Sequence, residues 1–165
     1  MAAIETEVAV VGSGPGGARV ARELARKGRQ VTLLEKGKWH RWQVGRSASV
    51  DGMTKLFRSA QGGLMARAIT AGGSSLIFNG NGFKPPSWLV SELGGAKPNS
   101  ICVAENLWGH PGGTAAIDAV VDRDLRAQAA ENLFVCEASV LPRSPPGRTP
   151  TLTIIGLAER LAASL

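Results

Sequence analysis

A glycine-rich motif that directly follows a short apolar stretch is the feature that most constrains the fold of this chain. Residues 4–11 alternate and then become continuously apolar, as expected for a strand buried in a parallel sheet. Three glycines then occur with the spacing G-x-G-x-x-G, at Gly12, Gly14 and Gly17. Residues 18–27 carry apolar side chains at helical spacing, and Gly28 ends the predicted helix. With a second short strand predicted at 31–34, the N-terminus is a βαβ unit.

The spacing of the three glycines has a physical reason. The first permits a tight turn, the second lets the backbone approach a pyrophosphate, and the third lets helix and strand pack closely. The helix N-terminus offers free N–H groups to the anion. Glu35 ends the second strand, where its carboxylate can accept hydrogen bonds from two ribose hydroxyls and disfavours the 2′-phosphate of NADP. A dinucleotide site is therefore predicted; the alternative is a glycine-rich turn beside an ordinary surface glutamate.

A second glycine-rich tract follows a short strand predicted at residues 64–69. Its small residues and hydroxyl groups suit the binding of a phosphate or a ribityl chain, and the candidate binding residues are Gly72, Gly73 and Ser74. Asn79 begins a further stretch that contains glycines. A plain surface loop is the alternative. Residues 36–63 are only weakly periodic, and no element is predicted for them.

His110 is the histidine that can serve as a base. It lies in a loop of proline and glycines at residues 108–114, and histidine is the side chain best matched to accepting a proton near neutral pH. The alternative is a structural hydrogen-bonding role, and His40, in a basic stretch, is interpreted as a solvated surface residue. Beyond this loop, short strands are predicted at 120–122 and 133–136, and a helix at 151–165.

Composition limits the function classes. A length of 165 residues allows one domain, or one domain with a small appendage. The net charge of +6 comes from the first 67 residues, where 12 Lys and Arg face 5 Asp and Glu, but a solvated helix face explains much of it, and no nucleic-acid partner is expected. Two cysteines without C-x-x-C spacing predict neither disulfides nor a metal site and fit a cytoplasmic protein. No membrane span and no signal peptide are predicted.

Four blocks of the sequence resemble the glucose-methanol-choline (GMC) family of flavin-dependent alcohol oxidoreductases. Residues 10–37 resemble the family's N-terminal FAD fingerprint, and residues 70–89 its internal glycine-serine signature. Residues 109–145 and 148–162 resemble the C-terminal block, which in the family brings the catalytic histidine and a flavin-facing helix. The resemblance covers roughly two thirds of the chain, and its C-terminal part is far more specific than the glycine motif alone.

The resemblance implies an α/β fold, a Rossmann-like FAD-binding domain of GMC type, with FAD as cofactor. The residues that match the ADP-binding positions are Gly12, Gly14, Gly17 and Glu35, and those that match the pyrophosphate and flavin positions are Gly72, Gly73, Ser74 and Asn79. Glu137 and Ala138 match positions near the ribityl chain, and the helix from Thr151 matches the one whose positive end faces the flavin. His110 matches the base that takes the hydroxyl proton of an alcohol.

Three departures from the family matter. Thr149 stands where the family commonly has asparagine or histidine beside the catalytic histidine, and Glu137 stands where it usually has aspartate. Residues 1–95 match the N-terminal part of the FAD domain and residues 99–165 its C-terminal block, so the domain is internally shortened and the central substrate domain is missing. Weak FAD affinity, low stability, little turnover and self-association through exposed apolar surface are expected in consequence.

The sequence therefore predicts an FAD-dependent oxidoreductase that acts on the CH–OH group of a small-molecule alcohol. One alternative is a non-catalytic FAD- or nucleotide-binding remnant of such an enzyme. Another, an NAD-linked Rossmann dehydrogenase, explains the first 35 residues but not the C-terminal block.

Overall fold

The computed structural model of the chain describes residues 3–39, 54–58, 64–74, 112–142 and 150–165. These residues belong to two compact units. The first consists of Met1–Phe78 together with Ala162–Leu165, and the second of Asn79–Leu161. The junction that the glycine- and proline-bearing stretch at residues 93–99 predicts lies outside the described residues.

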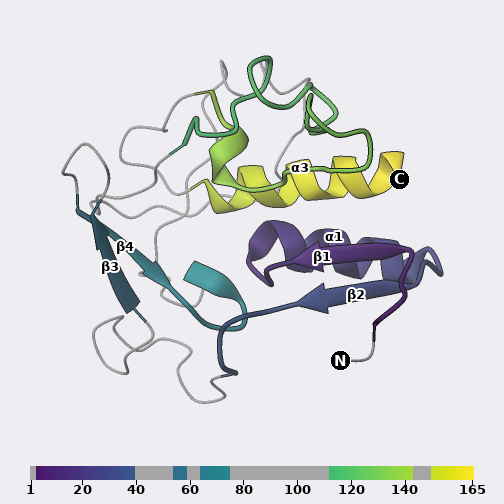
Figure 1. Cartoon of the computed structure of the whole chain (residues 1–165), viewed down its shortest axis with the longest axis horizontal. Helices are drawn as coiled ribbons and strands as arrows, with labels where there is room; N and C mark the ends of the chain where they lie inside the picture. Colours follow the sequence, from purple (N-terminus) through teal and green to yellow (C-terminus); the bar gives the residue numbers. More distant parts are fainter. Residues whose placement is uncertain (1–2, 40–53, 59–63, 75–111, 143–149) are drawn as a thin grey trace. The chain divides into compact units, whose positions relative to one another are not determined.

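The first unit begins with the βαβ arrangement that the glycine motif predicts. Strand β1 (Val8–Val11) pairs in parallel with β2 (Val31–Leu34), and helix α1 (Pro15–Arg26) connects them (Figure 1). The helix starts three residues earlier than predicted from its apolar spacing. A proline with its fixed φ suits the first helical position, so the helix begins inside the glycine motif.

Among the described residues of the first unit, helix α1 covers one face of this sheet. Helix α1 turns Val20 and Leu24 inward, toward the buried Val10 of β1. On the other face Val11 is 84% exposed and Leu34 is 48% exposed. The prediction of a strand buried in a parallel sheet is therefore wrong for one face of β1, because the sheet has two strands and α1 covers a single side.

A hairpin follows in the same unit. Strand β3 (Thr54–Arg58) pairs antiparallel with β4 (Leu64–Ala68), which confirms the strand predicted at 64–69, whereas β3 was not predicted. Beyond β4, Thr70 forms a parallel bridge with Lys38. This bridge needs the glycine beside it, because a Cβ on Gly37 would lie 2.2 Å from Thr70 Cα.

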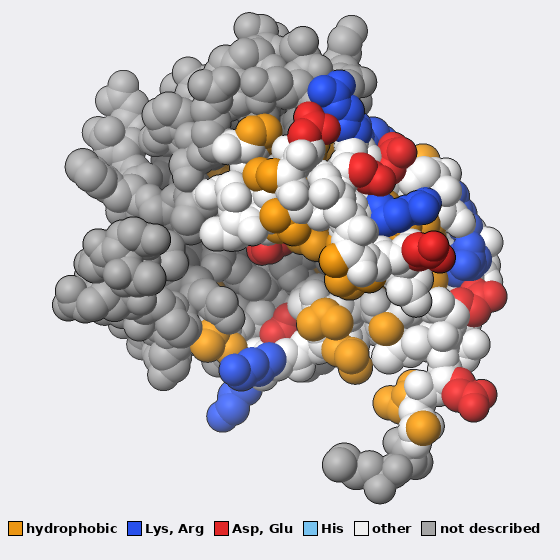
Figure 2. All heavy atoms as spheres, turned by 45° about the horizontal axis from the view of Figure 1, so that its top comes forward, with side chains coloured by type: hydrophobic (Ala, Val, Ile, Leu, Met, Phe, Trp, Pro, Cys, Tyr) orange, Lys and Arg blue, Asp and Glu red, His pale blue; other side chains and the backbone are white. Residues whose placement is uncertain are grey.

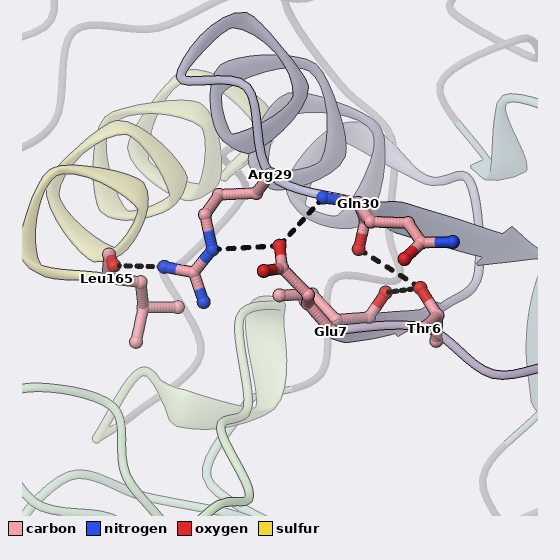
Figure 3. Close-up of polar contacts among 6 residues, drawn as sticks. Thr6, Glu7, Arg29, Gln30 and Leu165 are labelled. Atoms are coloured by element: carbon pink, nitrogen blue, oxygen red, sulfur yellow. Dashed lines mark hydrogen bonds and ion pairs between the residues drawn. The ribbon is translucent and has the colours of Figure 1, made fainter.

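Basic residues after α1 bind backbone carbonyls of the segment 162–165. Lys27 Nζ donates to Ala162 O at 2.5 Å and to Ala163 O at 3.1 Å. Arg29 donates to Leu165 O at 2.8 Å and also pairs with Glu7 at 3.2 Å (Figure 3). Lysine and arginine side chains thus satisfy carbonyls that a helix leaves unbonded at its C-terminal end.

We expect Lys27→Ala to lower the free energy of unfolding by about 1 kcal/mol, because a cation and its hydrogen bonds are lost from a helix C-terminus. Urea unfolding followed by circular dichroism measures the change. Lys36→Ala removes an exposed lysine away from any helix end and should change stability by less than about 0.5 kcal/mol. Equal losses of unfolding free energy in the two variants would show that the hydrogen bonds from Lys27 to the carbonyls of Ala162 and Ala163 contribute nothing to stability.

In the described part of the second unit, residues 112–142 form turns and residues 151–161 belong to a helix. Helix α3 (Thr151–Ser164), as predicted, brings the fully buried Leu157 into a core with Val121, Leu125, Val140 and Leu141. The short 3-10 helix η2 (Ala138–Val140) precedes it, and the carbonyl of Ser139 accepts hydrogen bonds from Gly113 N and Ala115 N at 3.1 and 3.0 Å.

The strands predicted at 120–122 and 133–136 are wrong. Val121 and Phe134 form isolated bridges with Ala127 and Arg126 instead of ladders. Leu125 lies between them with φ at 64°, and the chain reverses there too tightly for consecutive residues to pair. The apolar side chains that suggested strands lie in turns instead.

Two surface properties bear on the predicted partners. None of the helices among the described residues has the length and apolar character needed to cross a membrane. Figure 2 shows Lys and Arg side chains interspersed with Asp and Glu, and hydrophobic side chains exposed between them, over the described part of one face. The predictions on nucleic acid and self-association stay predictions.

Candidate functional site

The glycine loop between β1 and α1 has the geometry that its spacing predicts. Gly12 has φ at +92°, a left-handed conformation that a side chain would strain, and its N–H donates to Leu34 O at 2.7 Å. A Cβ on Gly17 would lie 2.1 Å from Gly12 O and 3.2 Å from Val10 Cγ1. The first glycine therefore makes the turn, and the third allows helix and strand to touch.

Gly14 faces open space at the beginning of α1. It is the N-cap residue, with φ at −62°, and a Cβ built on it meets no atom within 4 Å. No side chain caps this helix end, and its first turn carries no acidic residue. The backbone N–H groups and the positive end of the helix are thus open to an anion, as a phosphate-binding loop requires.

Glu35 is held against this loop. Its Oε2 accepts hydrogen bonds from Ser13 N at 2.8 Å and from Ser13 Oγ at 2.7 Å, and its Oε1 accepts one from Gly37 N. The Ser13 backbone, the Ser13 hydroxyl and the Gly37 backbone, in that order, lower the pKa of Glu35 below its ordinary value of 4.5. The carboxylate is therefore ionised at neutral pH.

The lowered pKa predicts how stability depends on pH. The ionised carboxylate stabilises the fold fully above its unfolded pKa, and the contribution is lost as pH falls through the lower folded value. We expect the free energy of unfolding of the wild type to fall more steeply between about pH 5 and pH 3 than that of Glu35→Gln. Glu7, whose pKa is lowered by Gln30 N and Arg29, is present in both proteins. Denaturant unfolding over a pH series measures both slopes, and equal slopes would contradict the prediction.

The second glycine tract lies against the first. Gly72 N donates to Ser13 Oγ at 2.8 Å, and a Cβ on Gly73 would lie 3.0 Å from Gly14 Cα. Ser74 Oγ accepts a hydrogen bond from Ala68 N at 3.1 Å, which ties the tract to β4. The tract is therefore not a separate surface loop, since the fold brings both glycine segments and Glu35 into one site.

Three other candidates belong to the second unit. Glu137 precedes η2 and accepts a hydrogen bond from Ser139 Oγ at 2.5 Å, Ala138 begins η2, and Thr151 begins α3. Next to Glu137, Cys136 packs its Sγ 4.0 Å from Ile154 O of α3. The candidates that lie outside the described residues are Asn79, His110 and Thr149.

Sequence reasoning missed two residues of the site. Ser13 bonds to Glu35 and Gly72, although only the glycines around it were singled out. Gly37 approaches the backbone of Thr70 and donates to Glu35. A glycine two residues after the predicted ribose-binding acid was the available signal for a close contact at this place.

Two family models match the chain. The model of the pyridine nucleotide-disulphide oxidoreductases matches residues 6–108, and the model of the GMC oxidoreductases matches residues 101–158. The two matches cover the N-terminal and the C-terminal blocks on which the predicted resemblance rests.

Curated relatives and a solved structure add to these matches. Neither inactivation nor afterpotential protein G of Drosophila melanogaster is 44% identical over 54 residues, which are 33% of this chain and 9% of that protein. An uncharacterized GMC-type oxidoreductase from Mycobacterium tuberculosis is 39% identical over 92 residues, 48% of this chain and 14% of that protein. The crystal structure of pyridoxine 4-oxidase from Mesorbium loti is 22% identical with a TM-score of 0.42, covering 55% of this chain and 21% of that one. The chain thus spans a small part of the length of the relatives it matches.

Proposed function

Since this chain belongs to the GMC oxidoreductases, with an N-terminal part of the pyridine nucleotide-disulphide oxidoreductase type, we propose that it binds FAD and oxidises the CH–OH group of a small-molecule alcohol. When bound, FAD supplies the acceptor for a hydride. The roles below are those of the chain's own residues.

The open helix end beside the held carboxylate is the observation that carries the proposal. Gly14 leaves room for a pyrophosphate where the N–H groups of α1 are uncapped, and Glu35 is ionised one loop away. An ADP group needs both features, an anion site and an acceptor for ribose. Gly72 and Gly73 lie against the same glycine loop, and because they carry no side chains they leave its space free for a ligand.

The chemical step needs a base. By the resemblance, His110 would accept the proton of the substrate hydroxyl as the hydride leaves the carbinol carbon, and Thr149 matches the position of a second polar group. Glu137 and Ala138 match positions that would hold the ribityl chain, and the N-terminus of α3 at Thr151 would stabilise negative charge with its helix dipole.

Titration of the purified full chain with FAD, followed by the flavin absorption and fluorescence, tests the cofactor. Saturable binding of weak affinity is expected for the wild type. Glu35→Ala should bind FAD about tenfold more weakly or worse, because hydrogen bonds to a charged group are lost. Thr6→Val, which removes a hydroxyl elsewhere in the same unit, is the matched control. A wild type without flavin, or equal affinity in Glu35→Ala, would contradict the proposal.

Anaerobic mixing of the loaded protein with aliphatic, aromatic and sugar alcohols tests the reaction. His110→Ala should leave FAD bound and slow its reduction by about 10²–10⁴-fold. Unchanged reduction would remove His110 from the mechanism.

A non-catalytic FAD-binding chain is the second candidate. The features that carry the proposal, the open helix end and the held carboxylate, serve binding of an ADP group and do not by themselves supply a base. Exposed Val11 and Leu34 leave apolar surface uncovered beside the site, and self-association through it is proposed as well. Stoichiometric FAD with no reduction by any alcohol would establish this candidate over the first.

A further inference from the structure

The side chain of Ser13 connects the three parts of the candidate site. Its hydroxyl donates to Glu35 Oε2 at 2.7 Å and accepts a hydrogen bond from Gly72 N at 2.8 Å. Its backbone N–H donates to the same Oε2 at 2.8 Å, and the residue is 9% exposed. Ser13 is thus a buried polar residue whose hydrogen bonds to described residues run to groups of the proposed nucleotide site.

The direction of each bond follows from the chemistry of the partners. A backbone N–H can only donate, and an ionised carboxylate can only accept. The hydroxyl must therefore accept the hydrogen bond from Gly72 N–H on a lone pair and donate its own O–H to Glu35 Oε2. An alanine at position 13 keeps the backbone bond to Glu35 but breaks this connection.

The same bonds limit what Glu35 can offer to a ligand. A carboxylate has about four lone-pair sites. Ser13 takes two of them on Oε2, and Gly37 N takes one on Oε1. The Lys36 backbone also lowers the pKa of this carboxylate through a hydrogen bond. At most one site therefore remains, on Oε1, so Glu35 can accept at most one ribose hydroxyl rather than the two that the sequence suggests.

We propose that Ser13 is a positioning residue for nucleotide binding: it fixes Oε2 of Glu35 against the glycine loop, so that Oε1 alone is presented to a ribose hydroxyl. This inference rests on the proposed binding of FAD. Ser13 touches the carboxylate and the second glycine tract, and it acts on the ligand through Glu35.

Two measurements on the full chain test the proposal, and the first needs no ligand. Carboxyl carbon NMR of the ligand-free protein, with the signal assigned by its loss in Glu35→Gln, should show a higher Glu35 pKa in Ser13→Ala than in the wild type. Among the described residues, hydrogen bonds rather than charged side chains lower this pKa, so removal of one donor is visible. Thr6→Val should leave it unchanged. An unchanged Glu35 pKa in Ser13→Ala would overturn the proposal.

The second measurement is calorimetric titration with ADP in a double-mutant cycle. Ser13→Ala should weaken ADP binding about tenfold in the wild-type background and have little further effect in Glu35→Gln, because both changes remove one coupled interaction. If Ser13 only supports the loop, the loss is the same in both backgrounds, and that result overturns the proposal. If Ser13→Ala does not fold, Ser13→Cys, with its weaker S–H donor, should shift pKa and affinity in the same directions by less.

The two proposals fail separately. A wild type that binds neither ADP nor FAD contradicts the proposed function, and the NMR comparison then still decides whether Ser13 positions Glu35. A wild type that binds ADP, with a Glu35 pKa unmoved by Ser13→Ala, leaves the proposed function intact and removes the role of Ser13.

Discussion

Gly17→Ala is expected to destabilise the first unit by about 3 kcal/mol or more, at or above the upper end of the usual cost of overpacking. The new methyl group would lie 2.1 Å from the carbonyl oxygen of Gly12. The neighbour is backbone in a turn that itself requires a positive φ, so it cannot rotate away as a side chain does. Thermal unfolding by far-UV circular dichroism should show a midpoint lowered by roughly 10–20 °C for a unit of this size.

Gly14→Ala is the matched control for this substitution. The same methyl group at Gly14 enters open space, and the backbone there, with φ at −62°, suits alanine, so less than about 1 kcal/mol of stability should be lost. The methyl group would, however, occupy the space proposed for the pyrophosphate, and FAD binding should fall. Equal stability losses in the two variants would contradict the packing role of Gly17, and unchanged FAD binding in Gly14→Ala would contradict the pyrophosphate site.

Cys136 is expected to react with iodoacetamide far more slowly than an ordinary thiol. Burial, above all, raises the pKa of its thiol from 9.0 to about 12, against a smaller lowering by Arg160. The thiolate fraction near pH 8 therefore falls by about 10³-fold, and the greater nucleophilicity of a more basic thiolate restores only part of this. Ionisation alone should slow alkylation about 30-fold, and shielding by the fold should slow it further.

The measurement uses a Cys102→Ser background, in which Cys136 is the remaining cysteine of the sequence. Mass spectrometry of the carbamidomethylated fraction over time gives the rate in native buffer and in guanidinium chloride. The denatured chain is the control, because unfolding returns the thiol to water and to its ordinary pKa. Equal rates in the two conditions would show that Cys136 is accessible and ionised in the folded protein.

The local geometry of the first unit could be predicted because it depends on residues that are close in sequence. The turn at Gly12, the close contact at Gly17 and the parallel pair β1–β2 are all encoded within the first 35 residues. The extent of burial could not be predicted in the same way. The apolar side chains of Val11 and Leu34 fit a covered face equally well, and whether a face is covered depends on tertiary neighbours.

The contacts between distant segments could not be predicted from spacing. The bond from Gly72 to Ser13 joins residues 59 positions apart, and no periodicity reports it. The strands expected at 120–122 and 133–136 failed for a related reason. Short apolar runs have the same pattern whether they pair in a ladder or are buried by turns, and the left-handed conformations of Asp118 and Leu125 favour the turns.

The bond between Lys27 and Ala162 has a consequence for biosynthesis. The two residues are 135 positions apart, and the whole of the second unit lies between them in the sequence. At about 5–20 residues per second, a ribosome needs roughly 7–27 s to travel from one to the other. The β1–α1–β2 segment is therefore synthesised well before residues 162–165, and the bonds from Lys27 and Arg29 to the carbonyls of that segment can form only after this delay.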